Sequence, residues 1–306
     1  MKVSLISTVK NEVSSVDKLM NSICRQTFPI DEIIIVDAGS NDGTLEKLFE
    51  WKKSLNNLKI LIVPQCNRSQ GRNIAIKNSN NNLIVATDFG CSLHNDWLKE
   101  ITAPVIEKEC DIVAGFYYNG DTNTFSMANS FFTHLDISEI NADLFLPSTR
   151  SIAFKKKVWE ETGGFNEHFI FGEDTLFSST IRNNNYKILF APFALVEWNA
   201  ERSILKMIKK LYHYSTWDGI GKFSNYFYIK MCATYLFGLC VLLFSVLYKG
   251  ILVFFFILIL IYFFRNYKLS NQKKLNCRAS VLAMCLKPIY NLVQIIGYLT
   301  GRATTS

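Results

Sequence analysis

The carboxylates best placed to do chemistry follow short apolar runs in the sequence. Asp37 directly follows the apolar residues 33–36, and Asp88 ends the run that starts at Leu83. A short apolar run bounded by turn residues is typical of a buried strand. In open α/β sheets, ligands bind beyond the carboxyl ends of the strands. One aspartate at a strand end is compatible with turn capping alone, but two at the same sheet edge indicate a ligand that contacts both.

A hard divalent cation suits the position of Asp88. Magnesium is usually bound by one or two carboxylates together with phosphate oxygens of a substrate. The sequence therefore predicts a site at Asp88 in which Mg²⁺ or Mn²⁺ holds the phosphates of a ligand.

A second acidic feature is the pair Glu173 and Asp174, in the segment FGEDTLF. The pair opens a predicted amphipathic helix that carries Leu176, Phe177 and Ile181. Acidic residues in a first helical turn are favoured by the helix dipole whatever their function. Both a structural and a catalytic interpretation are therefore open for this pair.

Strands and helices alternate through the first part of the chain, and this order positions the two strand-end aspartates. Predicted strands lie at residues 3–9, 32–37, 60–63, 83–87 and 111–117, with helical segments between them. Such alternation predicts an α/β fold made of parallel βαβ units with right-handed crossovers. The regular alternation is lost over residues 119–148.

Charge and apolar residues are distributed unevenly. The 306 residues carry a net charge of +7, and this length suggests about two domains. Apolar residues concentrate after residue 230 and cations flank that region, which indicates a membrane surface rather than nucleic acid as a partner. The eight cysteines include no C-x-x-C pair, and the apolar stretch near the N-terminus is too short for the h-region of a signal peptide. We therefore expect a reduced, cytoplasmic catalytic domain without a zinc site or a disulfide framework.

Several segments together carry a resemblance to a known family. In chain order they read VSLISTVKNE, IIIVDAGSNDGT, GRNIAI, TDFGC, SIAFKKKVWEETGGF and FGEDTLF. They resemble the inverting glycosyltransferases of family 2, over residues 1–200. The resemblance implies a GT-A domain with a Rossmann-like, mostly parallel mixed sheet. It also implies transfer of a sugar from a nucleotide-diphosphate sugar to a hydroxyl group.

The resemblance further implies roles for individual residues. The residues implied to bind the donor are Thr8, Glu12, Asp37 and Asp88, and Asp88 is also implied to hold the metal. Arg72, at the start of a predicted helix, is suited to bind the donor diphosphate, because a guanidinium binds phosphate oxygens bidentately. A solvated helix arginine is the alternative interpretation of Arg72. Asp174 is implied to be the base that deprotonates the acceptor hydroxyl, which a carboxylate in an enclosed site can do. The residues that resemble family positions near the acceptor or the diphosphate are Arg150, Glu173, Trp198 and Arg202.

Two positions depart from the family pattern. Ala38 stands where a second nucleotide-binding aspartate is frequent, and Gly90 stands where the metal motif has its second carboxylate. Because Gly90 replaces the second metal carboxylate, the protein can also be interpreted as a catalytically degenerate donor-binding scaffold of a glycan assembly complex. A third interpretation is a nucleotidylyltransferase on a similar sheet, which the glycine-free segment at residues 9–12 disfavours.

The remainder of the chain has the pattern of a membrane region. Residues 201–228 are predicted to form an amphipathic interfacial helix and a linker, with an apolar face made of Ile204, Leu205, Ile208, Leu211 and Tyr212. Residues 229–266 are predicted to form a transmembrane hairpin, because cations flank it and Lys249 alone lies between its arms. One kinked span and a re-entrant pair are the alternatives. Residues 267–306 are predicted to form a basic loop and a C-terminal amphipathic or membrane-associated helix.

Together these patterns predict a multi-pass protein of the inner (plasma) membrane with a cytoplasmic catalytic domain. Its partners would be the nucleotide-sugar donor, membrane lipids and a lipid-linked saccharide or polyprenyl-type acceptor, since a soluble acceptor would require no anchor. We expect a hexosyltransferase-type enzyme of cell-surface polysaccharide or glycolipid assembly. It would add one sugar per encounter, because a processive synthase would need more spans.

Overall fold

The computed structural model describes residues 1–304, apart from the side chains of residues 246, 247, 249–252 and 254. The chain divides into two compact units. Unit 1 comprises Met1–Gly120 and Ile137–Asn199, and unit 2 comprises Asp121–Asp136 and Ala200–Ser306. The chain thus leaves unit 1 at residue 121 and returns at residue 137, within the stretch where the sequence shows no regular alternation.

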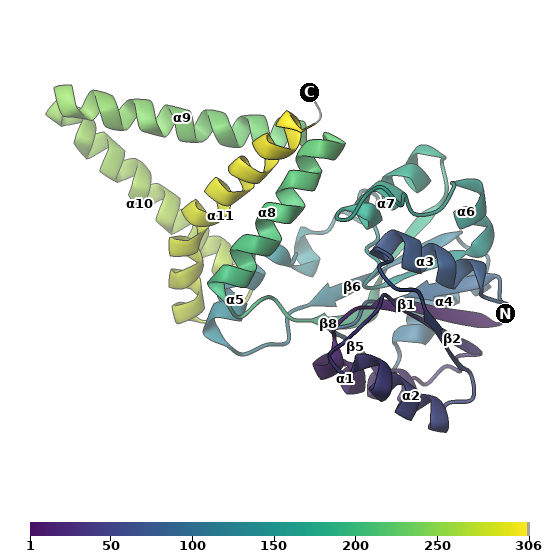
Figure 1. Ribbon diagram of the computed structural model, residues 1–306. Helices are drawn as coiled ribbons and strands as arrows, with labels where there is room; N and C mark the ends of the chain where they lie inside the picture. The colour runs from purple at the N-terminus through teal and green to yellow at the C-terminus, as the bar shows by residue number, and fades with distance from the viewer. Residues whose placement is uncertain (305–306) are drawn as a thin grey trace. The chain divides into compact units, whose positions relative to one another are not determined.

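Unit 1 is built on one mixed sheet (Figure 1), and its strand order over the described residues is β3-β2-β1-β4-β7-β6-β8-β5. The strands are β1 (Val3–Val9), β2 (Glu32–Asp37), β3 (Leu58–Ile62), β4 (Leu83–Ala86), β5 (Cys91–Leu93), β6 (Ile112–Tyr118), β7 (Ile152–Lys155) and β8 (Ile188–Trp198). β1 is parallel to β2 and β4, and β6 is parallel to β8. β7 is antiparallel to both β4 and β6. The carboxyl ends of β1, β2, β4, β6 and β8 therefore share one edge of the sheet.

Helices cover both faces of this sheet. They are α1 (Val13–Cys24), α2 (Thr44–Ser54), α3 (Arg68–Lys77), α4 (Trp97–Ile106), α6 (Lys156–Glu161) and α7 (Glu173–Asn183). On β2, Ile33 and Ile35 pack in the cluster formed with α1, α2 and α4, whereas Ile34 and Val36 pack in the cluster formed with α3, α6 and α7. Side chains alternate between the faces of a strand, so a strand buried on both faces has the continuous apolar run seen before Asp37.

Unit 2 is helical in its described residues. Its helices are α5 (Thr124–Thr133), α8 (Ile204–Gly221), α9 (Asn225–Leu247), α10 (Lys249–Gln272) and α11 (Cys277–Ala303). Glycines bring α8 and α11 into backbone contact. A Cβ on Gly301 would lie 1.9 Å from the carbonyl oxygen of Thr216, and a Cβ on Gly219 would lie 2.2 Å from that of Tyr298. Small residues allow helix backbones to approach this closely. α5 packs on α11 through Ala128, Ala279, Ala283 and Leu286.

The face of α8 that is buried in unit 2 overlaps the predicted apolar face only at Leu211. Met207, Leu211, Ser215 and Gly219 are buried, at intervals of four residues. Leu205, on the predicted face, is 75% exposed. The sequence pattern ranked positions by hydropathy, whereas contact with α11 depends on small side chains. The interfacial role of α8 stays a prediction.

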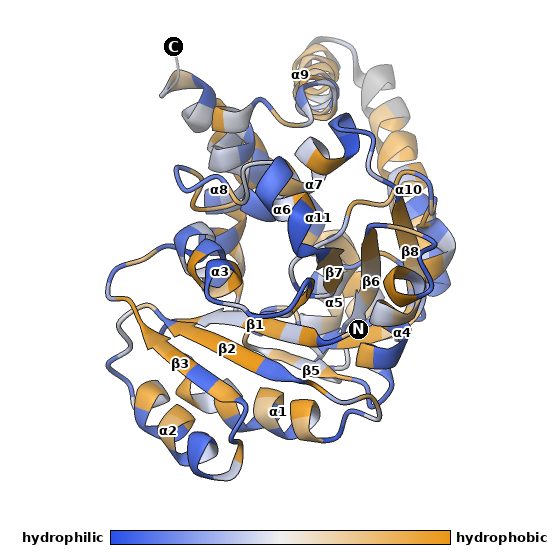
Figure 2. Ribbon diagram, turned by 90° about the vertical axis from the view of Figure 1, so that its right-hand side faces the viewer, coloured by the Kyte–Doolittle hydropathy of each residue, from blue (hydrophilic) through white to orange (hydrophobic). Residues whose placement is uncertain are grey.

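α9 and α10 are apolar over much of their length, as the hydropathy colouring shows (Figure 2). Leu236, Phe237 and Leu243 of α9 are each more than 60% exposed. Within the described part of the chain, residues 225–245 and the whole of α11 are long and apolar enough to cross a membrane. Extended exposed apolar surface marks contact with a membrane or a partner. Several side chains in the second arm of the predicted hairpin lie outside the described residues.

Candidate active site

Arg72 links two of the predicted site carboxylates. It lies on α3, which begins with a capping box between Asn67 and Gln70, and its side chain is 3% exposed. Its Nη2 donates to Oδ1 of Asp88 over 2.8 Å, and its Nη1 donates to Oε1 of Glu173 over 2.6 Å. The end of β4 and the start of α7 are therefore joined through one buried guanidinium.

The charges around Asp88 keep it ionised. Burial alone would raise the pKa of its carboxyl group, but the guanidinium of Arg72, followed by that of Arg150, more than offsets this effect, and the pKa is lowered. For Arg72, burial acts to lower the pKa, yet the negative charges of Asp88 and Glu173 raise it above its ordinary value. The site therefore holds full charges on both partners at neutral pH.

A polar loop before β7 connects Asp88 with Asp174. Thr149 donates from Oγ1 to Oδ2 of Asp88 over 3.3 Å, and Ser148 donates from Oγ to Oδ2 of Asp174 over 3.0 Å. Arg150 donates from Nη1 to Oγ of Ser148 over 2.9 Å. No sequence pattern indicated a role for Ser148 or Thr149. The signal available was a run of four polar residues between Pro147 and β7.

Aromatic rings support Arg150. Its guanidinium carbon lies 4.0 Å from the ring centroid of Trp198 and 5.2 Å from that of Tyr117. Trp198 ends β8 and Tyr117 lies near the end of β6. Cation–π contacts of this kind favour a fixed position for a cation above the rings. Arg150 and Trp198, both predicted site residues, are therefore brought together.

The two acidic residues that open α7 lie in different environments. Glu173 is 4% exposed and bonded to Arg72. Asp174 is partly exposed and accepts from the hydroxyl of Ser148 and from its neighbouring backbone N–H at Thr175. Asp174 is thus the carboxylate of this pair that a solvent-borne hydroxyl can reach.

The predicted nucleotide residues lie at the ends of β1 and β2. Asp37 is fully buried, and its Oδ2 accepts from the N–H groups of Gly39 and Ser40, each over 3.0 Å. Its Oδ1 is buried without a hydrogen-bond partner among the described residues. An unsatisfied buried acceptor is costly, so a ligand donor at this atom would stabilise the site.

Thr8 and Glu12 flank the same end of β1. Thr8 packs against α3, where a Cβ on Gly71 would lie 2.6 Å from its Cγ2. The carboxylate of Glu12 accepts from the hydroxyl of Ser15 over 2.7 Å. Both residues therefore lie at the shared edge of the sheet, with Thr8 next to the helix that carries Arg72.

Arg202 lies in unit 2, unlike the other predicted site residues. Its Nε and Nη2 donate to the carboxylate of Asp121 over 2.6 and 2.9 Å. The hydrogen bond from Arg202 lowers the pKa of Asp121 to about 2. This pair ties the start of the 121–136 segment to the segment that precedes α8.

The residues around Asp88 are compatible with a metal ion held in part by substrate. Among the described residues, no group of three or more histidine, cysteine or acidic side chains has the arrangement of a metal site. Asp88 is nevertheless ionised and 27% exposed, and a Cβ on Gly90 would meet nothing within 4 Å. A carboxylate offers about four lone-pair positions, so Asp88 can bind a cation besides its bonds to Arg72 and Thr149. Magnesium sites with one carboxylate, substrate phosphates and water are common.

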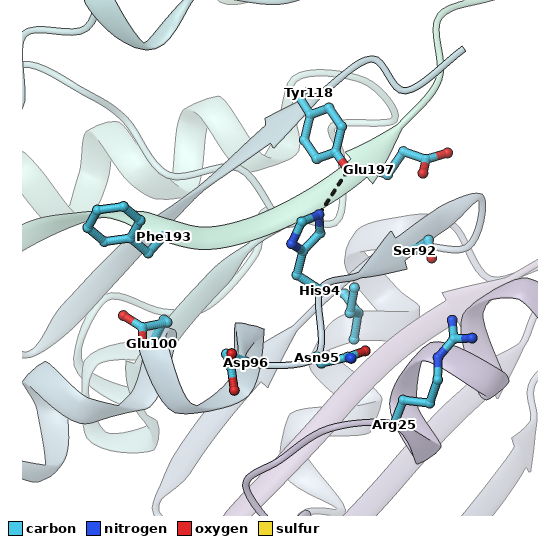
Figure 3. Close-up of a pocket in the computed structure, with 10 residues that line it drawn as sticks. Arg25, Ser92, His94, Asn95, Asp96, Glu100, Tyr118, Phe193 and Glu197 are labelled. Atoms are coloured by element: carbon cyan, nitrogen blue, oxygen red, sulfur yellow. Dashed lines mark hydrogen bonds between the residues drawn. The ribbon is translucent and has the colours of Figure 1, made fainter. Parts of the chain in front are cut away.

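Unit 1 also contains a pocket whose lining residues differ from those around Asp88. It has a volume of about 660 Å³ and is lined by residues that include His94, Tyr118, Phe193 and Glu197 (Figure 3). His94 Nε2 and the Tyr118 hydroxyl are 2.9 Å apart. The described lining contains three carboxylates and one arginine, which disfavours a polyanionic diphosphate. None of the predicted site residues lines it, so we place the candidate active site at Asp88 rather than in this pocket.

The family model for glycosyl transferase family 2 matches residues 4–167 of the chain. The chain belongs to glycosyltransferase family 2. A relative in Haloferax volcanii, glycosyltransferase AglE, is 30% identical, and the match covers 62% of this chain and 64% of that protein's length. The chain thus spans less than two thirds of the length of this relative. A relative in Methanococcus voltae is 25% identical over 84% of both chains. Its name is dolichyl N-acetyl-alpha-D-glucosaminyl phosphate 3-beta-D-2,3-diacetamido-2,3-dideoxy-beta-D-glucuronosyltransferase.

The solved structures confirm the GT-A fold. The mannosyltransferase PcManGT of Pyrobaculum calidifontis, solved in complex with GDP-Man and Mn²⁺, superposes with a TM-score of 0.56. It is 18% identical, and the match covers 70% of this chain and 62% of that one. The predicted fold class and the predicted membership of glycosyltransferase family 2 are therefore confirmed.

Proposed function

We propose that the protein transfers a sugar, with inversion, from a nucleotide-diphosphate sugar to a hydroxyl group of a lipid-linked saccharide or polyprenyl-type acceptor. A hexosyltransferase activity in cell-surface polysaccharide or glycolipid assembly belongs to the same proposal. Membership of family 2 supports inversion. The name of the Methanococcus voltae relative, which specifies a dolichyl-linked saccharide phosphate, supports a lipid-linked acceptor.

The observation that carries this proposal is the unequal environment of Glu173 and Asp174. Inverting transfer requires a base that reaches the acceptor hydroxyl. Glu173 is buried against Arg72, whereas Asp174 keeps accessible lone pairs and is oriented by Ser148. We therefore assign Asp174 as the base. As the acceptor oxygen attacks the anomeric carbon, its proton passes to Asp174, and the nucleoside diphosphate leaves with the electrons of the broken bond.

Arg72 and Arg150 have different roles in the proposed site. Both Nη atoms of Arg72 donate to carboxylates, so it positions Asp88 and Glu173; its direct contact with phosphate stays a prediction. Arg150, held over Trp198, lies close enough to lower the pKa of Asp88. A guanidinium binds phosphate oxygens well, so Arg150 is suited to face the donor diphosphate.

We further propose that Asp88 holds Mg²⁺ or Mn²⁺ together with the donor. When bound, the ion supplies Lewis-acid stabilisation of the leaving diphosphate. At the other end of the donor, the partner-free Oδ1 of Asp37 is suited to accept a hydrogen bond from the nucleotide. Thr8 and Glu12 complete this end of the proposed donor site.

The proposed acceptor requires the catalytic unit to work at a membrane. The exposed apolar side chains of α9 support insertion of α9 into the membrane. The α10 arm of the hairpin is proposed from the sequence pattern. We propose that the protein is a multi-pass protein of the inner membrane with unit 1 on the cytoplasmic side. The cations that precede α9 and follow the apolar part of α10 support this orientation.

The test compares Asp174→Asn with Glu173→Gln. A positioned general base typically contributes a factor of about 10²–10⁴, so Asp174→Asn should lose transfer by that factor. It should still bind the donor, measured as a thermal shift with the nucleoside diphosphate. Glu173→Gln should instead lower stability and weaken donor binding through Arg72. Native turnover in Asp174→Asn would remove Asp174 from the mechanism, and absence of donor hydrolysis by the native protein would favour the scaffold interpretation.

A further inference from the structure

The pocket shown in Figure 3 lies on the reverse face of the strands that support the candidate active site. Tyr118 on β6 and Ser92 on β5 are both register partners of Glu197 on β8, so these three lining side chains share one face of the sheet. Side chains alternate between the faces of a strand, so Tyr117 and Trp198, which contact the active-site guanidinium, lie on the other face. We call this cavity of about 660 Å³ the back pocket.

The charges of the back pocket are nearly balanced. Of its three carboxylates, that of Glu197 is paired with the Nζ of Lys18 over 2.7 Å. Among the described residues, the other charged lining side chains, Arg25, Asp96 and Glu100, take part in no ion pair. One cation is thus set against two carboxylates, so a strongly charged ligand of either sign gains little Coulomb energy there.

The lining combines hydrogen-bonding groups with a large exposed ring. Phe193 is 71% exposed and lines the pocket together with Glu100. Nε2 of His94 and the hydroxyl oxygen of Tyr118 are 2.9 Å apart, and the two rings meet edge to face. The pocket is therefore a hydrogen-bonding surface with an apolar ring beside it.

A sugar ring is complementary to this combination of groups. The face of an aromatic ring carries partial negative charge, so it attracts the weakly positive C–H groups on one face of a pyranose. Carboxylates accept strong, charge-assisted hydrogen bonds from hydroxyl groups. A neutral saccharide presents both kinds of group on one molecule and requires no net charge in its site.

We propose that the back pocket binds a neutral saccharide. Phe193 packs against one face of a sugar ring, and Asp96 and Glu100 accept hydrogen bonds from its hydroxyl groups. The volume of the pocket is within the range of small-molecule sites. Tyr118 is the last residue of β6 and Glu197 the last but one of β8, so the pocket lies at the sheet edge that carries the candidate active site.

This inference rests on the proposed function for the source of the saccharide. We take it to be a sugar of the acceptor glycan other than the one that carries the reacting hydroxyl group. A glycan that extends along the shared sheet edge would then contact the catalytic unit at two places.

The experiment measures binding and needs no activity. The full chain is placed in phosphatidylcholine nanodiscs, which carry no sugar, and is titrated with the methyl glycosides of glucose, galactose, mannose and N-acetylglucosamine. Binding is followed by saturation-transfer NMR, and at least one glycoside should bind. Glu100→Ala should weaken this binding about tenfold or more, because a hydrogen bond to a charged group is lost. Phe193→Ala should weaken it about fivefold, and Phe193→Tyr should retain it.

The matched controls change the same residue types outside the pocket. Phe49 on α2 is 44% exposed, and Glu107 is an exposed carboxylate at the end of α4; neither lines the pocket. Phe49→Ala and Glu107→Ala should bind the glycoside as the native chain does. Equal weakening in these controls would overturn the proposal, as would native affinity in both pocket variants or the absence of a signal from all four glycosides.

Two further arms exclude the active site as the place of binding. Asp174→Asn should leave glycoside binding unchanged, and an excess of UDP-glucose or GDP-mannose should not displace the glycoside. Loss of binding in that variant, or displacement by either nucleotide sugar, would place the glycoside in the acceptor or donor site and overturn the proposal.

The remaining arms test other ligands and separate the pocket from the proposed function. Choline or inorganic phosphate bound in place of any glycoside, and lost in Glu100→Ala, would overturn the proposal in favour of a charged ligand. Donor hydrolysis by the native chain is measured in parallel. Hydrolysis without glycoside binding refutes the pocket alone, whereas glycoside binding that depends on Phe193 and Glu100, without hydrolysis, refutes the proposed function alone.

Discussion

Replacing Arg72 with methionine should destabilise unit 1 by removing a buried charge partner. The side chain of Glu173 is 5% exposed and would be left with an uncompensated charge, whereas that of Asp88 is 27% exposed and can regain water. Breaking a buried ion pair by removing one partner costs about 3–5 kcal/mol. Because Asp88 can rehydrate, we expect the lower end of this range. For a domain of this size, about 3 kcal/mol corresponds to a fall in melting temperature of roughly 6–12 °C.

The unfolding of unit 1 can be measured through the reactivity of a native buried thiol. Cys91 on β5 is fully buried in unit 1, so it becomes reactive when that unit unfolds. The full chain in detergent is heated in steps, labelled with a thiol reagent, and scored at Cys91 by mass spectrometry. The exposed cysteines label throughout and serve as an internal control.

The double variant separates charge from volume. Arg72→Met with Glu173→Gln should recover much of the lost stability, because a neutral amide tolerates burial better than an unpaired carboxylate. A shift below roughly 2 °C for Arg72→Met, or a double variant as unstable as the single one, would refute the idea that the guanidinium compensates Glu173.

Three further outcomes are expected. Arg202 lowers the pKa of Asp121 from 3.8 to about 2, so Asp121→Asn should reduce the melting temperature at pH 7. This difference should fade as the pH falls through the interval between those values, and a pH-independent difference would contradict it. Gly301→Val should speed hydrogen exchange in α8 and α11 because its side chain would meet Thr216, while Gly238→Val, with nothing within 4 Å, should not. EDTA should stop sugar transfer and Mg²⁺ or Mn²⁺ should restore it; activity indifferent to the chelator would exclude the proposed metal role.

The sheet and the strand-end aspartates were predictable because local pattern determines them. The run before Asp37 is apolar at every position, which two covered faces require. The shared edge followed from parallel strand order, since parallel strands place their carboxyl ends together. These features depend on neighbours in sequence or on a topological rule.

The links between site residues were not predictable in the same way. Arg72 and Glu173 are 101 positions apart, and no local pattern pairs them. Ser148 and Thr149 contact the two carboxylates through loop geometry alone. α5 was missed although a start signal was present: Asn123 accepts from the N–H groups of Phe125 and Ser126 as a helix N-cap.

Residues 121–136 belong to unit 2 although they lie in the chain between two segments of unit 1, and this limits where the protein can be truncated. Cutting the chain at residue 200 would follow the domain boundary predicted from the sequence but would leave α5 attached to the catalytic part. That helix would then present Ala128 and its neighbouring phenylalanines to water, without the α11 surface that covers them. A catalytic fragment prepared for crystallisation therefore needs an internal deletion of this helix as well as a C-terminal truncation.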